Sequence, residues 1–386
     1  MTPVYLDYNA TTPLRPEVVD AMLPYLRERF GNPASTHWAG RRAKQGLEDA
    51  RDQVAALLHS RPAEVLFTSG GTESNNLALR GVIAAVRPHP THVVTTAIEH
   101  ASVLEPLRAL ELEGVSVTYL PVNGEGRLDT EVLRAALTTD TALVSIGMAN
   151  NEIGTIQPIS ELSRVVHERG ALLHVDAVQA AGKLPVDIIH LGADLLSLSA
   201  HKIYGPKGVG ALYVRKGTAL APLLLGGAQE REKRPGTENV AAVVGFGVAA
   251  TFAAQDLELA EAHCQQLTEQ LWQGIQTTIA EVTLNGPRHH RLANTLNVGF
   301  TGATGEGLMM GLDLAGVAVS TGSACAAGSL EPSHVLLALG RDEAAAKNAL
   351  RFSVGQYTTK QEIEHVLAIL PGIVEQVRRA ARSPES

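Results

Sequence analysis

The chain has 386 residues, with 32 Lys and Arg against 40 Asp and Glu, which gives a formal charge of −8. This acidic balance offers no basic surface to nucleic acid or to an anionic membrane, so we expect neither as a partner. Hydrophobic residues make up 45% of the chain and charged residues 19%, a globular composition that excludes a disordered or fibrous protein. The length suits two packed domains, or one large α/β unit with an appendage.

Neither the cysteines nor the apolar segments indicate secretion or membrane insertion. Two cysteines, Cys264 and Cys325, are too few for a disulfide framework, and a reducing compartment is the expected setting. No uncharged apolar run reaches the ~20 residues of a membrane span. The first residues have neither the basic start nor the apolar core of a signal peptide. The sequence therefore predicts a cytoplasmic protein.

Between residues 60 and 215, short aliphatic segments alternate with amphipathic helical stretches. Most of these segments are continuous apolar runs, which is typical of strands buried on both faces of a mainly parallel sheet. The alternation predicts βαβ units and a doubly wound α/β domain. The seven expected strands are residues 65–68, 92–96, 115–120, 142–146, 171–175, 194–198 and 210–214.

After residue 240 the pattern changes to fewer strands with flanking helices, which predicts a smaller α+β domain. One long helical stretch is expected over residues 241–279. Thr359 and Glu362 form a capping-box pattern that begins a last helix, 360–379. The first residues of the chain fit against either domain. The strands expected in this part are residues 295–300, 317–320 and 350–354.

Polar or ionisable residues follow five successive strands of the predicted parallel sheet. Because ligands of such sheets bind beyond the carboxyl ends of the strands, we expect these residues to share one site. Its candidate residues are Gly70, Gly71 and Thr72 after the first strand, His100 after the second, Asn150 and Asn151, then Asp176 and Gln179, and finally Ser199, His201 and Lys202.

Gly70, Gly71 and Thr72 lie at a strand-to-helix turn, where backbone N–H groups and the helix dipole favour an anion such as phosphate. The alternative is a tight turn with Thr72 as the helix N-cap. The segment matches neither G-x-G-x-x-G nor the phosphate loop that ends in G-K-[ST]. The chain therefore lacks the sequence signatures of a nicotinamide-dependent dehydrogenase and of an ATP-binding protein. A site for a single phosphate group is still compatible with this segment.

Asp176 and Lys202 add two further chemical groups to this rim. Asp176 ends an apolar strand, either as a buried carboxylate that needs a partner or as a helix N-cap. Lys202 follows the next strand, either as a surface lysine or as a desolvated, nucleophilic amine. Pyridoxal 5′-phosphate (PLP) requires a lysine, an acidic partner for its ring nitrogen and a phosphate site. The combination favours PLP as the cofactor, and we assign no metal ligand.

Eight collinear motifs, spread from residue 5 to the last strand, resemble those of the group I cysteine desulfurases. They are YLDYNATTP (5–13), TSGGTESN (68–75), NNEIG (150–154), HVDAVQ (174–179), SAHK (199–202), RPGTEN (234–239), STGSAC (320–325) and LRFS (350–353). The resemblance implies the PLP-dependent type I aminotransferase fold and a homodimer. It divides the chain into a large domain, 13–255, with a mainly parallel seven-stranded sheet, and a small α+β domain, 1–12 and 256–386.

The resemblance also implies a role for each matching residue. Lys202 would bind the cofactor covalently, Asp176 would pair with the ring nitrogen, and His100 would stack on the ring and move protons. Asn151 and Arg351 would hold the substrate carboxylate. The cofactor contacts it implies are Gly71, Thr72, Ser199 and His201 at the phosphate, with Thr237 of the partner subunit, Gln179 at the ring hydroxyl, and His100, Asn151, Asp176 and Lys202 elsewhere on PLP.

Cys325 distinguishes these enzymes from other proteins of the same fold. It lies in a run of small residues, within a loop expected over about 320–332, and the resemblance makes its thiolate the acceptor of sulfur from L-cysteine. The products would be L-alanine and a persulfide on Cys325, which passes its sulfur to an acceptor protein. Cys264, on a predicted helix with apolar neighbours, is instead expected to be a packing residue.

Other functions remain open on sequence grounds. A selenocysteine lyase or another PLP-dependent transferase, such as an aminotransferase, would share the fold and cofactor. A non-catalytic sulfur carrier that kept the fold is the alternative of another class. The acceptor is expected to be an iron–sulfur scaffold or a tRNA-thiolation enzyme, and the sequence does not decide between them.

Overall fold

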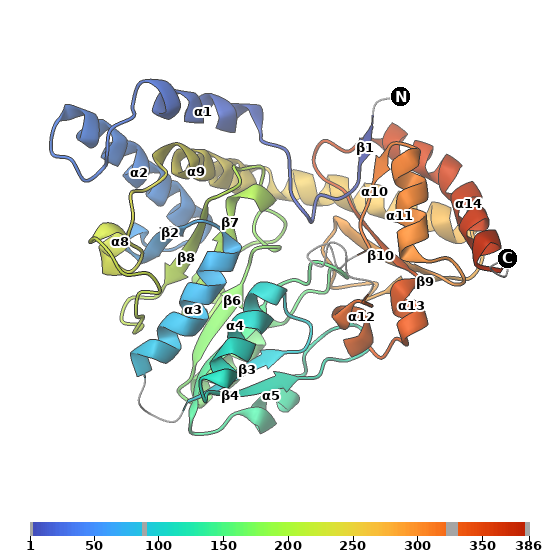
Figure 1. The fold of residues 1–386 in the computed structure, drawn as a ribbon, viewed down its shortest axis with the longest axis horizontal. Coiled ribbons are helices and arrows are strands. Elements are labelled where there is room, and N and C mark those ends of the chain that lie inside the picture. Colours follow the sequence, from blue (N-terminus) through green and yellow to red (C-terminus); the bar gives the residue numbers. More distant parts are fainter. Residues whose placement is uncertain (1–2, 87–90, 322–330, 383–386) are drawn as a thin grey trace.

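The computed structural model describes residues 3–86, 91–321 and 331–382, which form one large and one smaller region (Figure 1). In this part of the chain, seven strands form the central sheet of the large region, in the order β2-β8-β7-β6-β5-β3-β4. The strands are β2 (Val65–Thr68), β3 (His92–Thr96), β4 (Ser116–Leu120), β5 (Thr141–Gly147), β6 (Leu172–Asp176), β7 (Leu195–Ser199) and β8 (Gly210–Val214). The seven strands predicted for this sheet are confirmed, with ends shifted by one residue at most, whereas the strand expected over 317–320 ends at Ala318.

The sheet is parallel except at β8, which pairs antiparallel with both β2 and β7. Neighbouring residues of a strand point to opposite faces and so enter two different cores. Val94 and Val144 belong to one core, whereas Val93 and Leu143 belong to the other. The predicted α/β class with a mainly parallel sheet is therefore confirmed.

Helices cover both faces of this sheet. The strand residues of one face pack with α1 (Pro16–Arg27), α2 (Trp38–Leu57), α5 (Thr130–Ala136), α6 (Ile159–Glu168), α7 (Ile188–Leu191) and α9 (Val240–Gln255). Those of the other face pack with α3 (Gly71–Val86) and α4 (Ala101–Leu112). Beside α2 lies the short α8 (Gln229–Glu232), whose Glu230 binds Arg51.

The smaller region is built on a three-stranded antiparallel sheet with β10 in the middle, and on a two-stranded pair. Its strands are β9 (Val282–Asn285), β10 (Thr295–Phe300) and β12 (Ala349–Ser353), with β1 (Val4–Tyr5) parallel to β11 (Val317–Ala318). Its helices are α10 (Leu257–Thr278), α11 (Gly305–Leu314), α12 (His334–Ala338), α13 (Glu343–Lys347) and α14 (Lys360–Arg382).

The N-terminal segment lies on the smaller region, since Val4 and Leu6 enter the same core as α10, β10 and α14. Figure 1 shows β1 beside these late elements of the chain. The sequence left this placement open, because a two-residue parallel strand carries no local signal for a partner more than 300 residues away. The domain boundaries at 12/13 and 255/256 stay a prediction.

The prediction of one long helix over 241–279 is wrong in its middle. Asp256 separates α9 from α10, and the two helices are bent by 72°. The Asp256 carboxylate accepts a hydrogen bond from Arg15 Nη1 at 2.5 Å, a contact between distant parts of the chain. Local helix propensity does not register such a contact, so the sequence pattern extended the helix through the break.

Candidate functional site

A cavity of about 350 Å³ lies at the carboxyl ends of the central strands. The segments that follow β2, β3, β5, β6 and β7 all reach it, as expected for an open parallel sheet. The predicted site residues that line it are Gly71, Thr72, His100, Asn151, Asp176, Gln179, Ser199, His201, Lys202 and Arg351.

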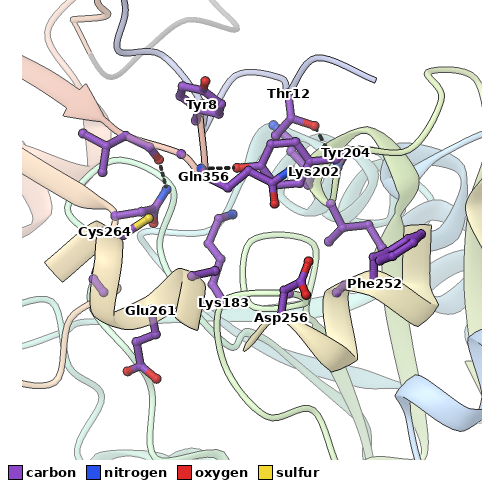
Figure 2. Close-up of a pocket in the computed structure, with 18 of the residues that line it drawn as sticks. Tyr8, Thr12, Lys183, Lys202, Tyr204, Phe252, Asp256, Glu261, Cys264 and Gln356 are labelled. Atoms are coloured by element: carbon purple, nitrogen blue, oxygen red, sulfur yellow. Dashed lines mark hydrogen bonds between the residues drawn. The ribbon is translucent and has the colours of Figure 1, made fainter. Parts of the chain in front are cut away.

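Lys202 lies on the 3₁₀ turn that follows β7, so the sheet fixes the start of its side chain. Its Nζ donates to the backbone oxygens of Asn9 at 2.5 Å and Ala10 at 2.8 Å. Two residues later, Tyr204 has the left-handed φ of 65°, which is strained for a bulky residue. Thr12 and the Gln356 backbone hold Tyr204 there through hydrogen bonds of 2.8 Å (Figure 2). The amine is therefore anchored at the cavity wall.

Asp176 is the last residue of β6, and two donors hold its carboxylate. Asn75 Nδ2 donates to Oδ2 at 2.7 Å, and the Val178 N–H donates to Oδ1 at 3.0 Å. Turns follow Asp176 directly, and α7 begins only at Ile188, so the alternative of a helix N-cap is wrong. The strand delivers a fixed acceptor to the cavity.

His100 is the N-cap of α4, and this role fixes its tautomer. Its Nδ1 accepts from the Ser102 N–H at 3.1 Å. Because a backbone N–H only donates, Nδ1 of the neutral ring has no proton and Nε2 carries it. The Ser102 hydroxyl lies 2.8 Å from Nδ1 and accepts from Asn75 Nδ2 at 2.8 Å. Hydrogen bonds through Ser102 and Asn75 thus connect His100 with Asp176.

The start of α3 forms another part of the cavity wall and presents the N–H groups of its first turn. The helix begins at Gly71, so Thr72 lies within it and is not the N-cap considered above. A Cβ on Gly71 would lie 2.7 Å from Val178 Cγ2, and only glycine lets the helix begin this close to the segment after β6. Ser199 lies beside this start, with its Cβ 3.6 Å from the same position.

His201 is neutral at pH 7. Burial, together with the positive charges of Lys202, Lys207 and Lys183, lowers the pKa of His201 to about 4. Its Nδ1 lies 3.1 Å from the hydroxyl of Thr11. A neutral imidazole in the same cavity as the α3 N-terminus can serve as a hydrogen-bonding group for an anion and adds no charge of its own.

Arg351, in the middle of β12, is almost fully buried. Its Nη2 donates to Asp7 Oδ1 at 2.6 Å, and its Nη1 donates to the backbone oxygen of Asn151 at 3.1 Å. Within the described residues, its Nε is buried without a hydrogen-bond partner. The guanidinium is therefore oriented in advance at the cavity, and its contact with a substrate carboxylate stays a prediction.

Of the residues singled out from the sequence, Gly70, Thr237 and Cys264 do not line this cavity. Thr237 is exposed and does not line the cavity of its own protomer. Cys325 lies outside the described residues, as does most of the loop predicted around it. Cys264 on α10 is buried, and burial raises the pKa of its thiol to about 11 (Figure 2). A thiol with such a pKa is a poor nucleophile, in keeping with the packing role expected for it.

Sequence reasoning missed Asn9, Asn75, Glu99 and Ser102 as cavity residues. Asn9 and Asn75 belong to the quoted motifs, and Glu99 precedes His100, but no local pattern marks these side chains as facing a ligand. Burial raises the pKa of Glu99 to about 8. Its carboxyl group accepts from the Thr96 hydroxyl at 2.6 Å and from the Gly147 N–H at 2.9 Å.

Comparison with known proteins places this fold and cavity in a family. The model of the class-V aminotransferase family matches residues 4–366. A cysteine desulfurase IscS of Dictyoglomus turgidum is 49% identical over 97% of this chain and 95% of its own length. The chain belongs to the class-V aminotransferases and, within them, to the cysteine desulfurases. Cysteine desulfurase 1 of Trichormus variabilis is 47% identical over 98% of this chain and 94% of its own.

Solved structures agree with this membership of the class-V aminotransferase family. A NifS-like protein superimposes with a TM-score of 0.92 at 39% identity, covering 97% of this chain and 100% of that one. SspA in complex with cysteine gives a TM-score of 0.83 at 36% identity, covering 92% of this chain and 100% of that one. The expected type I aminotransferase fold is thereby confirmed.

No single helix in residues 3–86, 91–321 and 331–382 is both long and apolar enough to cross a membrane. Helices α9 and α10 meet the length and composition requirements only as a pair, with the 72° bend between them.

Proposed function

We propose that this protein is a PLP-dependent cysteine desulfurase, which converts L-cysteine to L-alanine and keeps the sulfur on Cys325. The observation that carries the proposal is that one cavity holds the Lys202 amine, the Asp176 carboxylate and the N-terminus of a sixteen-residue helix, α3. These are the nucleophile, the acid and the anion site that PLP requires. The cysteine desulfurases among its relatives support the substrate.

The donor set of the cavity fits PLP. Within the described residues, Asn75 Oδ1 and Arg351 Nε are buried polar atoms of cavity residues that have no partner in the protein. The residues that would hold the cofactor are Gly71, Thr72, Ser199 and His201 at the phosphate, Gln179 at the ring hydroxyl, and His100, Asn151, Asp176 and Lys202 around the ring. When bound, PLP supplies an electron sink for the carbanion that forms beside the substrate carboxylate.

The side chains of the chain divide the remaining work. Negative Asp176 keeps the ring nitrogen protonated. Arg351 and Asn151 hold the substrate carboxylate and thereby orient the Cα–H bond. Lys202 Nζ removes the Cα proton, and His100 transfers protons through Nε2, the nitrogen that carries one in its neutral form.

Sulfur leaves the substrate through Cys325. The Cys325 thiolate forms an S–S bond to the substrate sulfur, and the C–S bond breaks with its electron pair staying on carbon. A proton delivered to that carbon and the return of a proton to Cα complete L-alanine, and Cys325 is left as a persulfide. Selenocysteine would undergo the same steps, which makes a selenocysteine lyase a related alternative.

The proposal extends to the assembly and the cell. The protein would act as a homodimer in the cytoplasm, with Thr237 of each protomer contacting the phosphate in the partner's cavity. The persulfide would be passed to an iron–sulfur scaffold or a tRNA-thiolation enzyme. The exposed position of Thr237, away from its own cavity, supports the dimeric arrangement.

Absorbance and product analysis test this function. The purified protein with PLP should be yellow and form L-alanine from L-cysteine. Lys202→Ala should lose the visible band and alanine formation, whereas Lys216→Met, which removes an exposed lysine, should keep both. Retention of the band and activity in Lys202→Ala, or absence of alanine with yellow wild-type protein, would contradict the proposal.

A further inference from the structure

Lys183 is a half-buried lysine that no step above uses. It follows Gly182, which has a left-handed φ of 70°. Its Nζ donates to the backbone oxygen of Gln179 at 3.1 Å and to Gln179 Oε1 at 3.0 Å. Within the described residues no carboxylate forms an ion pair with it. Burial, and then the positive charge of Lys202, lower the pKa of Lys183 to about 7. A lysine amine withdrawn from water without an acidic partner is costly and calls for a role.

The partner of Lys183 lies in the cofactor cavity. Gln179 lines that cavity, and its Nε2 donates to the backbone oxygen of Asn9 at 2.9 Å. The same oxygen accepts from Lys202 Nζ. Because the Asn9 oxygen only accepts, the Gln179 Nε2 must face it, and Oε1 then faces Lys183 Nζ, which donates to it. Lys183 and Lys202 are thus joined through two intervening residues.

Lys183 also reaches a second cavity, of about 50 Å³ (Figure 2). Lys183 and Lys202 both line it, and it has room for a few water molecules that would satisfy the remaining N–H of Lys183. The other titratable groups around it are Tyr8, Arg15, Tyr204, Asp256, Glu261 and Cys264. Lys183 therefore lines this second cavity and contacts Gln179, which lines the cofactor cavity.

We propose that Lys183 is a positioning residue of the cofactor site, which holds the Gln179 amide nitrogen toward the ring hydroxyl. This inference rests on the proposed function, since it assigns Gln179 to PLP. One N–H of Gln179 Nε2 is given to Asn9, and the other is the donor that the side chain offers to the ring oxygen. Without Lys183, only the hydrogen bond to Asn9 resists rotation of the Gln179 amide. Rotation would place Gln179 Oε1, instead of Nε2, toward the oxygen of the ring hydroxyl.

A double-mutant cycle separates this role from a purely structural one. The readouts are the Kd of the apoprotein for PLP and the absorbance maximum of bound PLP. Lys183→Met should raise the Kd about tenfold, the loss expected for one charge-assisted hydrogen bond, and should shift the absorbance maximum. In a Gln179→Ala background the same change should alter the Kd less than about twofold, because coupling through Gln179 is lost.

Two further variants complete the test. Lys183→Arg keeps donors and has the adjoining cavity for its extra atoms, so it should restore the Kd to within about threefold of wild type. Lys216→Met is the matched control, with no change expected. If Lys183→Met fails to unfold cooperatively on heating as apoprotein, Lys183→Gln replaces it in the cycle.

The possible failures are distinct. Equal effects of the Lys183 change with and without Gln179, or no effect on Kd and absorbance, would overturn the role of Lys183 while wild-type protein still binds PLP and forms alanine. A wild-type protein that binds no PLP would instead overturn the proposed function, and the role of Lys183 with it.

Discussion

Arg351 and Asp7 form a buried ion pair, with Nη2 2.6 Å from Oδ1, that links the smaller sheet to the N-terminal segment at the edge of the cavity. The arginine side chain is 2% exposed and the aspartate 17%. The Asn151 oxygen holds the other end of the guanidinium. A substrate carboxylate would thus bind an Arg351 guanidinium that is already oriented and already paired with the Asp7 carboxylate.

Asp7→Asn should lower the stability of the free protein and increase the gain in stability that substrate binding provides. Loss of the Asp7 charge leaves the Arg351 guanidinium buried without an ionic partner, at a cost of about 2–4 kcal/mol in the free energy of unfolding. The carboxylate of L-cysteine would restore the missing charge. Thermal unfolding should therefore show a lower Tm for the variant and a larger rise in its Tm with L-cysteine than in wild type.

Asp20→Asn, which changes an exposed carboxylate on α1, is the control for Asp7→Asn and should leave the Tm within about 1 °C of wild type. An Asp7→Asn variant as stable as wild type, with an unchanged response to L-cysteine, would show that the pair does not hold Arg351.

Glu99→Gln should stabilise the apoprotein at alkaline pH. The pKa of Glu99 is about 8 in the folded protein against its ordinary 4.5, so the folded state holds a proton that the unfolded chain has lost. Stability from this group is complete below pH 4.5 and falls as pH rises toward 8. The glutamine side chain does not titrate and so loses no stability over this range. At pH 8 the free energy of unfolding of Glu99→Gln should exceed that of wild type by on the order of 1–3 kcal/mol.

Urea unfolding of the Glu99→Gln apoprotein at several pH values measures this difference. The gap between the variant and wild type should narrow as pH falls from 8 to 5. A constant gap across that range would mean that the carboxyl group titrates normally, and would contradict the raised pKa.

Glu230→Gln should cost about 3–5 kcal/mol in the free energy of unfolding. Glu230 binds Arg51 through both carboxylate oxygens, at 2.7 and 2.8 Å, and accepts from the Phe67 N–H on β2. The amide would leave the buried Arg51 charge with only the more exposed Glu48 carboxylate as an ionic partner. Urea unfolding measures the loss, and pairing Glu230→Leu with Arg51→Met should recover much of it.

Glu48→Gln provides the comparison for this ion pair, because Glu48 also contacts Arg51 but its side chain is 47% exposed. We expect it to change the free energy of unfolding by less than ~1 kcal/mol. Equal losses in the Glu48 and Glu230 variants would show that burial does not govern the strength of these pairs.

The sequence predicted the parts of this molecule that depend on local pattern. Apolar runs located the central strands, and the residues after them located the cavity, because strand ends of a parallel sheet meet at one edge. The strands β1 and β9 carry no comparable signal, since each is short and depends on a partner strand. The break at Asp256 and the pairing of Arg351 with Asp7 depend on contacts between distant segments, which no local pattern encodes.

The role of Lys183 illustrates the same limit. In the sequence it is one lysine after a glycine, and no local pattern links it to Gln179, a candidate residue at the end of a predicted strand. The turn between Gln179 and Lys183 brings the two side chains together. Only the folded chain reveals that this lysine contacts a residue of the cofactor site.

The central claim is that the sulfur of L-cysteine passes to Cys325, and product stoichiometry tests it most directly. With a reductant to release persulfide sulfur, the wild-type protein should form L-alanine and sulfide in equal amounts. Cys325→Ser should stay yellow but lose sulfide release, and Cys264→Ser, which changes the buried cysteine, should retain it. Sulfide release by Cys325→Ser at the wild-type rate would contradict the account.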